Sequence, residues 1–390
     1  MKGFTMAGSK EFLDQFGSET FEERPFCDGD AIAFCEISYM PLKGIVPETF
    51  DEEPVNLPDA YYRVFAARGY KHGGLGLMIT PAPSIRLMQM AESLRYKDIK
   101  VYAVKDVYSL NPAIQFTAMT FLLPDGTAVI AFEGTDDTLA GWKEDADMLI
   151  RKGTPAYKLA MDYLNAAAEK FDGDLIIVGH SKGGHEALYT ALNCSPEIRS
   201  RIKYLYNNDG PGFFTDAFFK TGAYDELKDR YRHFVPYSSF IGMLMCHDND
   251  YIAVDSTKHL GPVQHDMGTW QIENGWLVRK NDIDFLGKLT DVFFEKLVSN
   301  TNETHYEALD KYLTDLILGT GQETLTNLAK NAVSAVKGAK KAIDNIDPEV
   351  KDTVKSILKI SGKLAKESFI TVKNGAKEKA ETVRTLVTEH

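Results

Sequence analysis

The sequence is short of several features that would point to particular classes of protein. Its four cysteines, among 390 residues, form no C-x-x-C pair, so reduced thiols are expected and a disulfide scaffold is not. The net charge of −12 leaves no basic excess to neutralise phosphates, and nucleic acid is therefore not an expected partner. No uninterrupted run of about 18 apolar residues occurs, so no membrane span is predicted.

Motifs for phosphate, cofactor and metal binding are also missing. The sequence has no G-x-x-x-x-G-K-[ST] loop and no G-x-G-x-x-G after a predicted strand. Cys246, His247 and Asp248 lie together, but no second group of metal ligands accompanies them. We therefore predict no cofactor and no metal. Residues 1–11 lack the apolar core and cleavage site of a signal peptide, and we expect a cytoplasmic protein.

What the sequence does contain is the pattern of an α/β fold. Residues 99–109, 114–123 and 127–132 are predicted as consecutive strands with short connections, so the sheet should begin antiparallel. After residue 155, helices alternate with strands, as in a mostly parallel sheet that helices cover on both faces. These later strands are predicted at 175–178, 202–206, 231–235 and 251–254, with a hairpin at 270–278.

The composition changes near residue 281, where the strand signals end. We expect residues 1–280 to form the α/β domain and residues 281–390 to form a helical arm. Within the arm, residues 321–390 hold 13 Lys and Arg against 9 Asp and Glu, and their apolar positions fall on helical stripes. Three roles stay open for the arm: packing on the acidic body, peripheral contact with a membrane or lipid surface, and binding of a partner or second copy.

The strongest functional signal lies in Asp174–Gly184. The apolar run Leu175–Val178 predicts a buried strand, the pattern G-x-S-x-G centred on Ser181 follows at once, and helical spacing begins at His185. A strand, a sharp turn and a helix in this order are the context of a nucleophile elbow, where glycines relieve crowding around the serine. Ser181 is the predicted nucleophile, and the alternative is a tight turn with an idle serine.

A serine nucleophile needs a base to remove its proton and a carboxylate to orient that base. In α/β-hydrolases the chain order is nucleophile, acid and histidine, which puts the base downstream of Ser181. His265 lies in a Gly-, Pro- and Gln-containing loop after the last parallel strand and is the predicted base, with His247 as second choice. His185 on the elbow helix and His233 inside a strand fit the role less well.

The acid is predicted at the end of a strand. Asp209 ends the strand that follows the elbow helix, in N-D-G-P-G-F, where glycines and proline would fix a carboxylate at the edge of the sheet. Asp248 and Asp250 follow the next strand and remain alternatives. A plain turn cap is the other interpretation of Asp209.

An oxyanion hole needs two donors, each typically worth about 3 kcal/mol in the transition state. One is predicted to be the backbone N–H of Lys182, the residue after the nucleophile. The other is predicted in the loop after an early strand, where the N–H of Thr135, and also its hydroxyl, could donate. Trp142, Lys143 and Asp145 are expected to brace that loop without reacting.

Three motifs carry a family resemblance: V-I-A-F-E-G-T ending at Thr135, W-K-E-D beginning at Trp142, and V-G-H-S-K-G-G around Ser181. Together they resemble the class 3 (fungal-type) lipases, whose pattern is A-F-R-G-T, W-x-x-D and G-H-S-x-G-G. Over about residues 20 to 365 the chain more closely resembles an uncharacterised bacterial family of α/β-hydrolase-like proteins in the lipase clan. That likeness adds R-P-F at 24–26, I-S-Y at 37–39, N-D-G-P-G-F at 208–213, H-D-N-D-Y at 247–251 and Q-H-D at 264–266.

The resemblance implies a serine hydrolase fold and supports Ser181, with His265 in the place of the base. It gives no settled substrate. One departure concerns the acid: class 3 lipases have an aspartate shortly before a Val-Pro pair, and this chain has His233 there. The acid must therefore come from another position, which favours Asp209 or the pair Asp248 and Asp250.

Two functions are consistent with these observations. The first is a serine esterase that cleaves small acyl esters or lipids through an acyl-enzyme on Ser181. The alternative is a non-catalytic binding protein, or a membrane-associated scaffold, built on a hydrolase fold.

Overall fold

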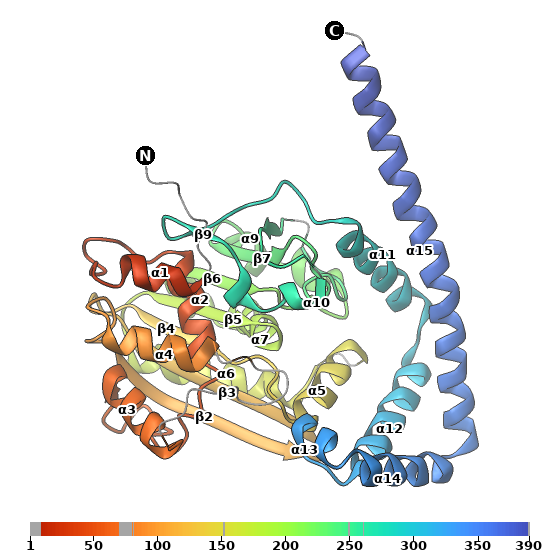
Figure 1. Cartoon of the computed structure of the whole chain (residues 1–390), viewed down its shortest axis with the longest axis horizontal. Coiled ribbons are helices and arrows are strands. Elements are labelled where there is room, and N and C mark those ends of the chain that lie inside the picture. Colours follow the sequence, from red (N-terminus) through yellow and green to blue (C-terminus); the bar gives the residue numbers. More distant parts are fainter. Residues whose placement is uncertain are drawn as a thin grey trace.

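An eight-stranded sheet forms the centre of the protein (Figure 1). The computed structural model describes residues 9–69, 80, 82–150, 153–248, 250–259 and 261–388. The strands follow one another across the sheet in chain order, antiparallel from β1 to β4 and parallel from β4 to β8. They are β1 (Val55–Asn56), β2 (Lys100–Leu110), β3 (Ala113–Leu122), β4 (Ala128–Phe132), β5 (Leu175–His180), β6 (Ile202–Asn208), β7 (Tyr231–Pro236) and β8 (Ile252–Val254). The α/β fold with an antiparallel start is confirmed.

Both faces of the central strands are buried, since a hydrophobic core covers each side of the sheet. Successive side chains of a strand point to opposite faces and therefore enter different cores. In β5, Leu175 and Ile177 enter one hydrophobic core, while Ile176 and Val178 enter the other. This double burial explains why the strand is a continuous apolar run instead of an alternating one. The core that contains Ile176 and Val178 includes α1 (Ser9–Phe16), α2 (Asp28–Ile37), α3 (Leu57–Ala67) and α4 (Ala82–Glu92). The core that contains Leu175 and Ile177 includes α6 (Pro155–Lys170) and α7 (Lys182–Asn193).

Shorter elements connect the strands and build the edge of the sheet where the strands end. One helix that the sequence pattern does not predict, α5 (Leu139–Ile150), follows the loop after β4. The hairpin predicted at 270–278 is present as β9 (Ile272–Glu273) and β10 (Trp276–Leu277). The remaining pieces are α8 (Pro196–Arg201), α9 (Gly222–Leu227), α10 (Gly261–Gln264) and the 3₁₀-helices η1 (Asp216–Lys220) and η2 (Met267–Thr269).

The C-terminal helices lie along one side of the body, and α15 extends well beyond it (Figure 1). Contacts join them to the body: Lys143 on α5 forms an ion pair with Asp310 on α12, at 2.5 Å, and Thr138 forms a bridge with Thr324. No helix in the described ranges has the length and apolar character to span a bilayer. These helices are α11 (Phe285–Asn300), α12 (Glu303–Thr320), α13 (Leu325–Lys330), α14 (Ala332–Asn345) and α15 (Pro348–Thr388). The domain boundary at 280 stays a prediction.

Candidate active site

Ser181 lies at a sharp turn between β5 and α7. Its backbone angles are φ +56° and ψ −128°, which a residue with a side chain rarely adopts. A Cβ on Gly179 would collide with the carbonyl of Gly183, and a Cβ on Gly183 would collide with the backbone of Phe132 in β4. The flanking glycines therefore permit the turn, as the motif predicts.

His265 and Asp209 face each other across the end of the sheet. The Nδ1 atom of His265 lies 2.7 Å from Oδ2 of Asp209, whose side chain is fully buried. The second carboxylate oxygen of Asp209 accepts the hydroxyl of Ser239 at 2.6 Å and the N–H of Gly242 at 3.0 Å. A carboxylate only accepts, so Nδ1 of His265 carries the proton and its Nε2 is left as the acceptor.

The alternative residues lie elsewhere. Asp248 accepts a hydrogen bond from Nδ1 of buried His233 at 2.9 Å, and Asp250 is exposed. Nε2 of His247 faces Asp291 on α11 at 3.2 Å; burial lowers the pKa of His247, but this contact raises it above the usual histidine value. None of Asp248, Asp250 and His247 lines the cavity at Ser181. Of the three candidate acids, Asp209 is the one that contacts His265.

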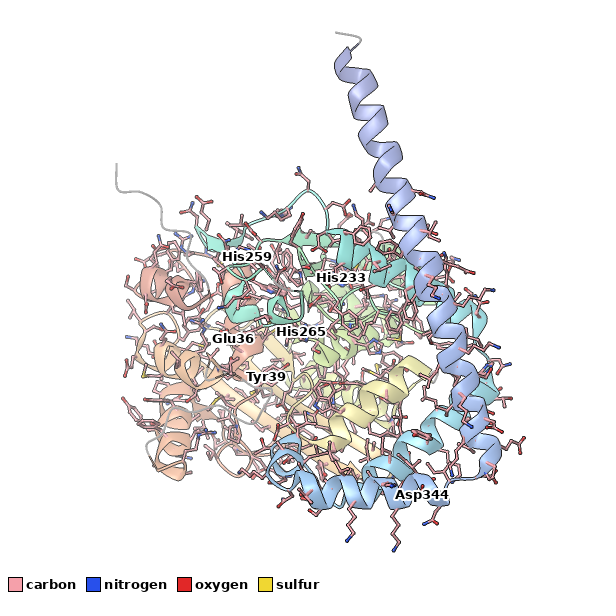
Figure 2. All side chains as sticks on the ribbon, turned by 45° about the vertical axis from the view of Figure 1, so that its right-hand side comes forward. Glu36, Tyr39, His233, His259, His265 and Asp344 are labelled. Atoms are coloured by element: carbon pink, nitrogen blue, oxygen red, sulfur yellow. The ribbon has the colours of Figure 1, made fainter. Side chains whose placement is uncertain are left out.

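A mainly apolar cavity of about 320 Å³ opens at Ser181. Figure 2 shows His265, Tyr39 and Glu36, three of its lining residues, in one region of the molecule. A larger cavity of about 700 Å³ beside α6 contains none of the candidate residues, so we place the chemistry in the smaller one. The other residues that line the smaller cavity are Thr80, Ala82, Pro83, Thr135, Trp142, Asp145, His180, Ile241, Val263, Asp266 and Met267.

Thr135 lines this cavity from the loop after β4. Its hydroxyl donates to both oxygens of Asp145 on α5, at 2.8 and 2.7 Å, so Asp145 braces the loop. Burial raises the pKa of Asp145 to about 6, although the charge of Lys182 opposes the rise. Because the hydroxyl proton of Thr135 is engaged, its backbone N–H is the donor left for an oxyanion. Lys182 begins α7, where the first N–H groups have no partner within the helix.

The side chain of Lys182 is fully buried behind the elbow, which the sequence does not reveal. Its Nζ atom donates to Oε2 of Glu144 at 3.1 Å and to Oε1 of Gln115 at 2.6 Å. Burial lowers the pKa of Lys182, but nearby carboxylates, Glu144 foremost, raise it above the usual lysine value. This buried ion pair links the start of α7 to α5 and β3.

Sequence reasoning also gave no role to two other cavity residues, Tyr39 and His180. The hydroxyl of Tyr39 lies 2.8 Å from Nδ1 of His180, and Nε2 of His180 lies 2.8 Å from the backbone oxygen of His265. His180 occupies the first variable position of G-x-S-x-G, and Tyr39 belongs to the I-S-Y segment of the family resemblance. The G-x-S-x-G motif and the I-S-Y segment are both visible in the sequence, but neither indicates that the side chains of His180 and Tyr39 meet.

In the described part of the chain, no three His, Cys, Asp or Glu residues are grouped so that they could hold a metal ion. No curated protein and no solved structure matches the chain. A comparison with protein families matches residues 90–316, more than half of the chain, to the Mbeg1-like family. The matched range contains Thr135, Ser181, Asp209 and His265, and it continues past residue 280 into α12. The chain therefore belongs to the Mbeg1-like family, which is a lipase-like family.

Proposed function

We propose that the protein is a serine hydrolase that cleaves carboxylic esters of acyl or lipid substrates through an acyl-enzyme on Ser181. The observation that carries the proposal is the hydrogen bond between His265 and Asp209 beside the cavity that also contains strained Ser181. Membership of a lipase-like family supports it. The likeness of the motifs to those of class 3 lipases agrees with the same chemistry.

In the proposed reaction, Oγ of Ser181 attacks the ester carbonyl while Nε2 of His265 removes the proton of the Ser181 hydroxyl. The N–H groups of Lys182 and Thr135 stabilise the oxyanion, and Asp209 stabilises the imidazolium. His265 then gives the proton to the leaving alcohol, so the ester C–O bond breaks and an acyl-enzyme forms. A water molecule, deprotonated by His265, attacks the acyl-enzyme and releases the carboxylic acid and free Ser181.

Apolar residues around the cavity suggest a lipid substrate and contact with a lipid surface. Ile241, Val263 and Met267 line the cavity and suit an acyl chain. We define an apolar collar as Phe240, Val263, Phe285, Leu286 and Phe369, which are all exposed. The N–H of Asp284, the residue before Phe285, donates to the carbonyl of Tyr237 at 2.7 Å and so joins the segment of Phe285 to the segment that leads to Phe240. The rings of Phe285 and Phe369 lie 5.6 Å apart. Exposed apolar surface of this kind is typical of sites that contact a membrane or another molecule.

Labelling with a fluorophosphonate probe tests the nucleophile. The wild type should be labelled, Ser181→Ala should not, and Ser200→Ala, at an exposed serine on α8, should label like the wild type. A panel of chromogenic esters with graded acyl lengths then gives the substrate preference. A folded wild-type sample that takes up no label and cleaves no ester would overturn the proposal.

Vesicle binding separates an esterase from a scaffold. We expect co-sedimentation with vesicles of phosphatidylcholine and phosphatidylglycerol, weakened by Phe240→Ser and Phe285→Ser and unchanged by Ser181→Ala. Hydrolysis of the lipid by the wild type would support a lipid esterase. Binding with no hydrolysis of any ester would instead favour the membrane-associated scaffold.

A further inference from the structure

The buried imidazole of His180 is held at both of its nitrogens. His180 is the last residue of β5 and directly precedes Ser181. Its Nδ1 lies 2.8 Å from the hydroxyl of Tyr39, and its Nε2 lies 2.8 Å from the backbone oxygen of His265. With both nitrogens engaged, the ring cannot rotate without losing a hydrogen bond in a buried site, which is unfavourable.

The partners of His180 determine its tautomer. A backbone carbonyl can only accept, so Nε2 carries a proton and donates it to the oxygen of His265. Burial lowers the pKa of His180 well below the usual histidine value, and a charge on His265 lowers it further. The ring is therefore neutral, and its Nδ1 accepts the hydroxyl proton of Tyr39.

Beyond its hydrogen bond with His180, Tyr39 contacts the oxyanion loop, the segment after β4 that contains Gly134 and Thr135. The hydroxyl of Tyr39 packs directly against the backbone of Gly134, the residue before Thr135. A Cβ at position 134 would collide with this hydroxyl and with the carbonyl of His180, so only glycine permits the approach. Burial raises the pKa of Tyr39 well above its usual value, so the hydroxyl keeps the proton that it donates.

The ring of His180 also lies against the ring of His265, with centroids 4.4 Å apart and planes tilted by 34°. When His265 takes the proton of Ser181, it becomes a cation. A second cation at this distance would oppose that step, whereas a neutral ring does not. The neutral ring of His180 therefore packs against His265 without placing a second positive charge beside it.

We propose that Tyr39 and His180 are positioning residues: their hydrogen bonds to each other and to His265, and the close packing of Tyr39 on Gly134, fix the oxyanion loop and the base relative to each other. The inference rests on the proposed function, because it assigns His265 and Thr135 the roles of base and oxyanion donor. It extends the site by two residues of the cavity wall that take no part in the proton transfer from Ser181.

The test measures fluorophosphonate labelling rates, and kcat and KM for a chromogenic ester, as functions of pH. Tyr39→Phe and His180→Leu should lower the labelling rate and kcat about 10- to 100-fold with little change in KM, because the base and the oxyanion donor lose their relative position. His180→Gln, whose amide offers one donor and one acceptor, should recover most of the rate. The double variant Tyr39→Phe/His180→Leu should be no slower than the slower single variant, because both break one chain.

Tyr163→Phe is the matched control, because its buried hydroxyl bonds Thr120 at 3.0 Å on the other face of the sheet. It should leave the labelling rate and the pH profile unchanged. If His180→Leu does not fold, Tyr39→Phe, which removes a single oxygen, carries the test.

The outcomes separate the inference from the function on which it rests. Wild-type rates and pH profiles in Tyr39→Phe and His180→Leu, with a wild type that labels, would overturn the inference alone. Equal losses in His180→Gln and His180→Leu would also overturn it, because the hydrogen bonds would then not matter. A folded wild type without labelling would remove the proposed function itself.

Discussion

Oδ2 of Asp209 and Nδ1 of His265 lie 2.7 Å apart, although 56 residues separate them in the chain. The hydroxyl of Ser239 and the N–H of Gly242 hold the other carboxylate oxygen of Asp209. These two contacts orient the carboxylate independently of His265. The carboxylate in turn selects the tautomer in which Nε2 of His265 can accept a proton.

The first prediction concerns this pair. Asp209→Asn keeps the size of the side chain, but its amide favours the wrong tautomer of His265, as documented for a triad aspartate. We expect kcat for a chromogenic ester to fall about 10³- to 10⁴-fold, with a matching loss in the rate of fluorophosphonate labelling. The folded fraction is checked by near-ultraviolet circular dichroism.

Asp248→Asn is the matched control, because Asp248 pairs with His233 and not with His265. It should lower the melting temperature, since a buried charged partner is lost, yet leave kcat of the folded enzyme near the wild-type value. A large loss of kcat in Asp248→Asn, together with an active Asp209→Asn, would contradict the assignment of the acid.

The second prediction concerns the loop after β4. Thr135→Val removes the hydroxyl that bonds Asp145, so the N–H of residue 135 loses its fixed position. We expect kcat to fall about 10- to 100-fold with little change in KM, because an oxyanion donor acts mainly in the transition state. Thr135→Ser keeps the hydroxyl and should stay close to the wild type. Equal rates in the Val and Ser variants would show that the contact with Asp145 does not position the donor.

Part of this site could be predicted because its signals are local in the sequence. Ser181 lies between an apolar run and a helix, and the glycines beside it are required by the backbone of the same turn. Asp209 and His265 each follow a predicted strand, and the ends of parallel strands meet at one edge of the sheet. Order along the chain and strand ends are therefore enough to bring these three residues together.

The rest depends on contacts between distant segments. Tyr39 and His180 are 141 residues apart, and no periodicity indicates that a turn after α2 meets the end of β5. Lys182 would be expected at the surface from its residue type, and it is buried because α5 supplies Glu144. The helix α5 itself is missed because W-K-E-D is interpreted only as a family motif, although Thr138 caps the start of the helix by accepting the N–H of Gly141 at 3.1 Å. Contacts with distant segments therefore decide the positions of Tyr39, His180 and Lys182.

The third prediction is a pH dependence of stability at Glu133. Burial, and then the charge of Asp136, raises the pKa of the Glu133 carboxyl from 4.5 to about 8. The folded state thus holds the proton more tightly than the unfolded state, so this group lowers the free energy of unfolding as pH rises from about 4.5 to about 8. Glu133→Gln removes the titration and should raise the free energy of unfolding at about pH 8, by on the order of 4 kcal/mol, with almost no gain at about pH 4.

Urea denaturation at a series of pH values measures this effect. Glu169→Gln, at an exposed position on α6, should keep the pH dependence of the wild type. A Glu133→Gln variant whose stability changes with pH in parallel with the wild type would show that the pKa of Glu133 is the same in the folded and unfolded states.

The fourth prediction concerns the ion pair behind the elbow. Lys182→Met keeps the length of the side chain but leaves Glu144 buried without its cation, and breaking such a pair costs about 3–5 kcal/mol. We expect urea denaturation to show a loss of this size, whereas Lys158→Met, in an exposed pair with Asp162, should change little. The N–H of residue 182 remains, so Lys182→Met that is still folded should be labelled by the fluorophosphonate. Wild-type stability in Lys182→Met would mean that the buried lysine does not hold α7 against α5.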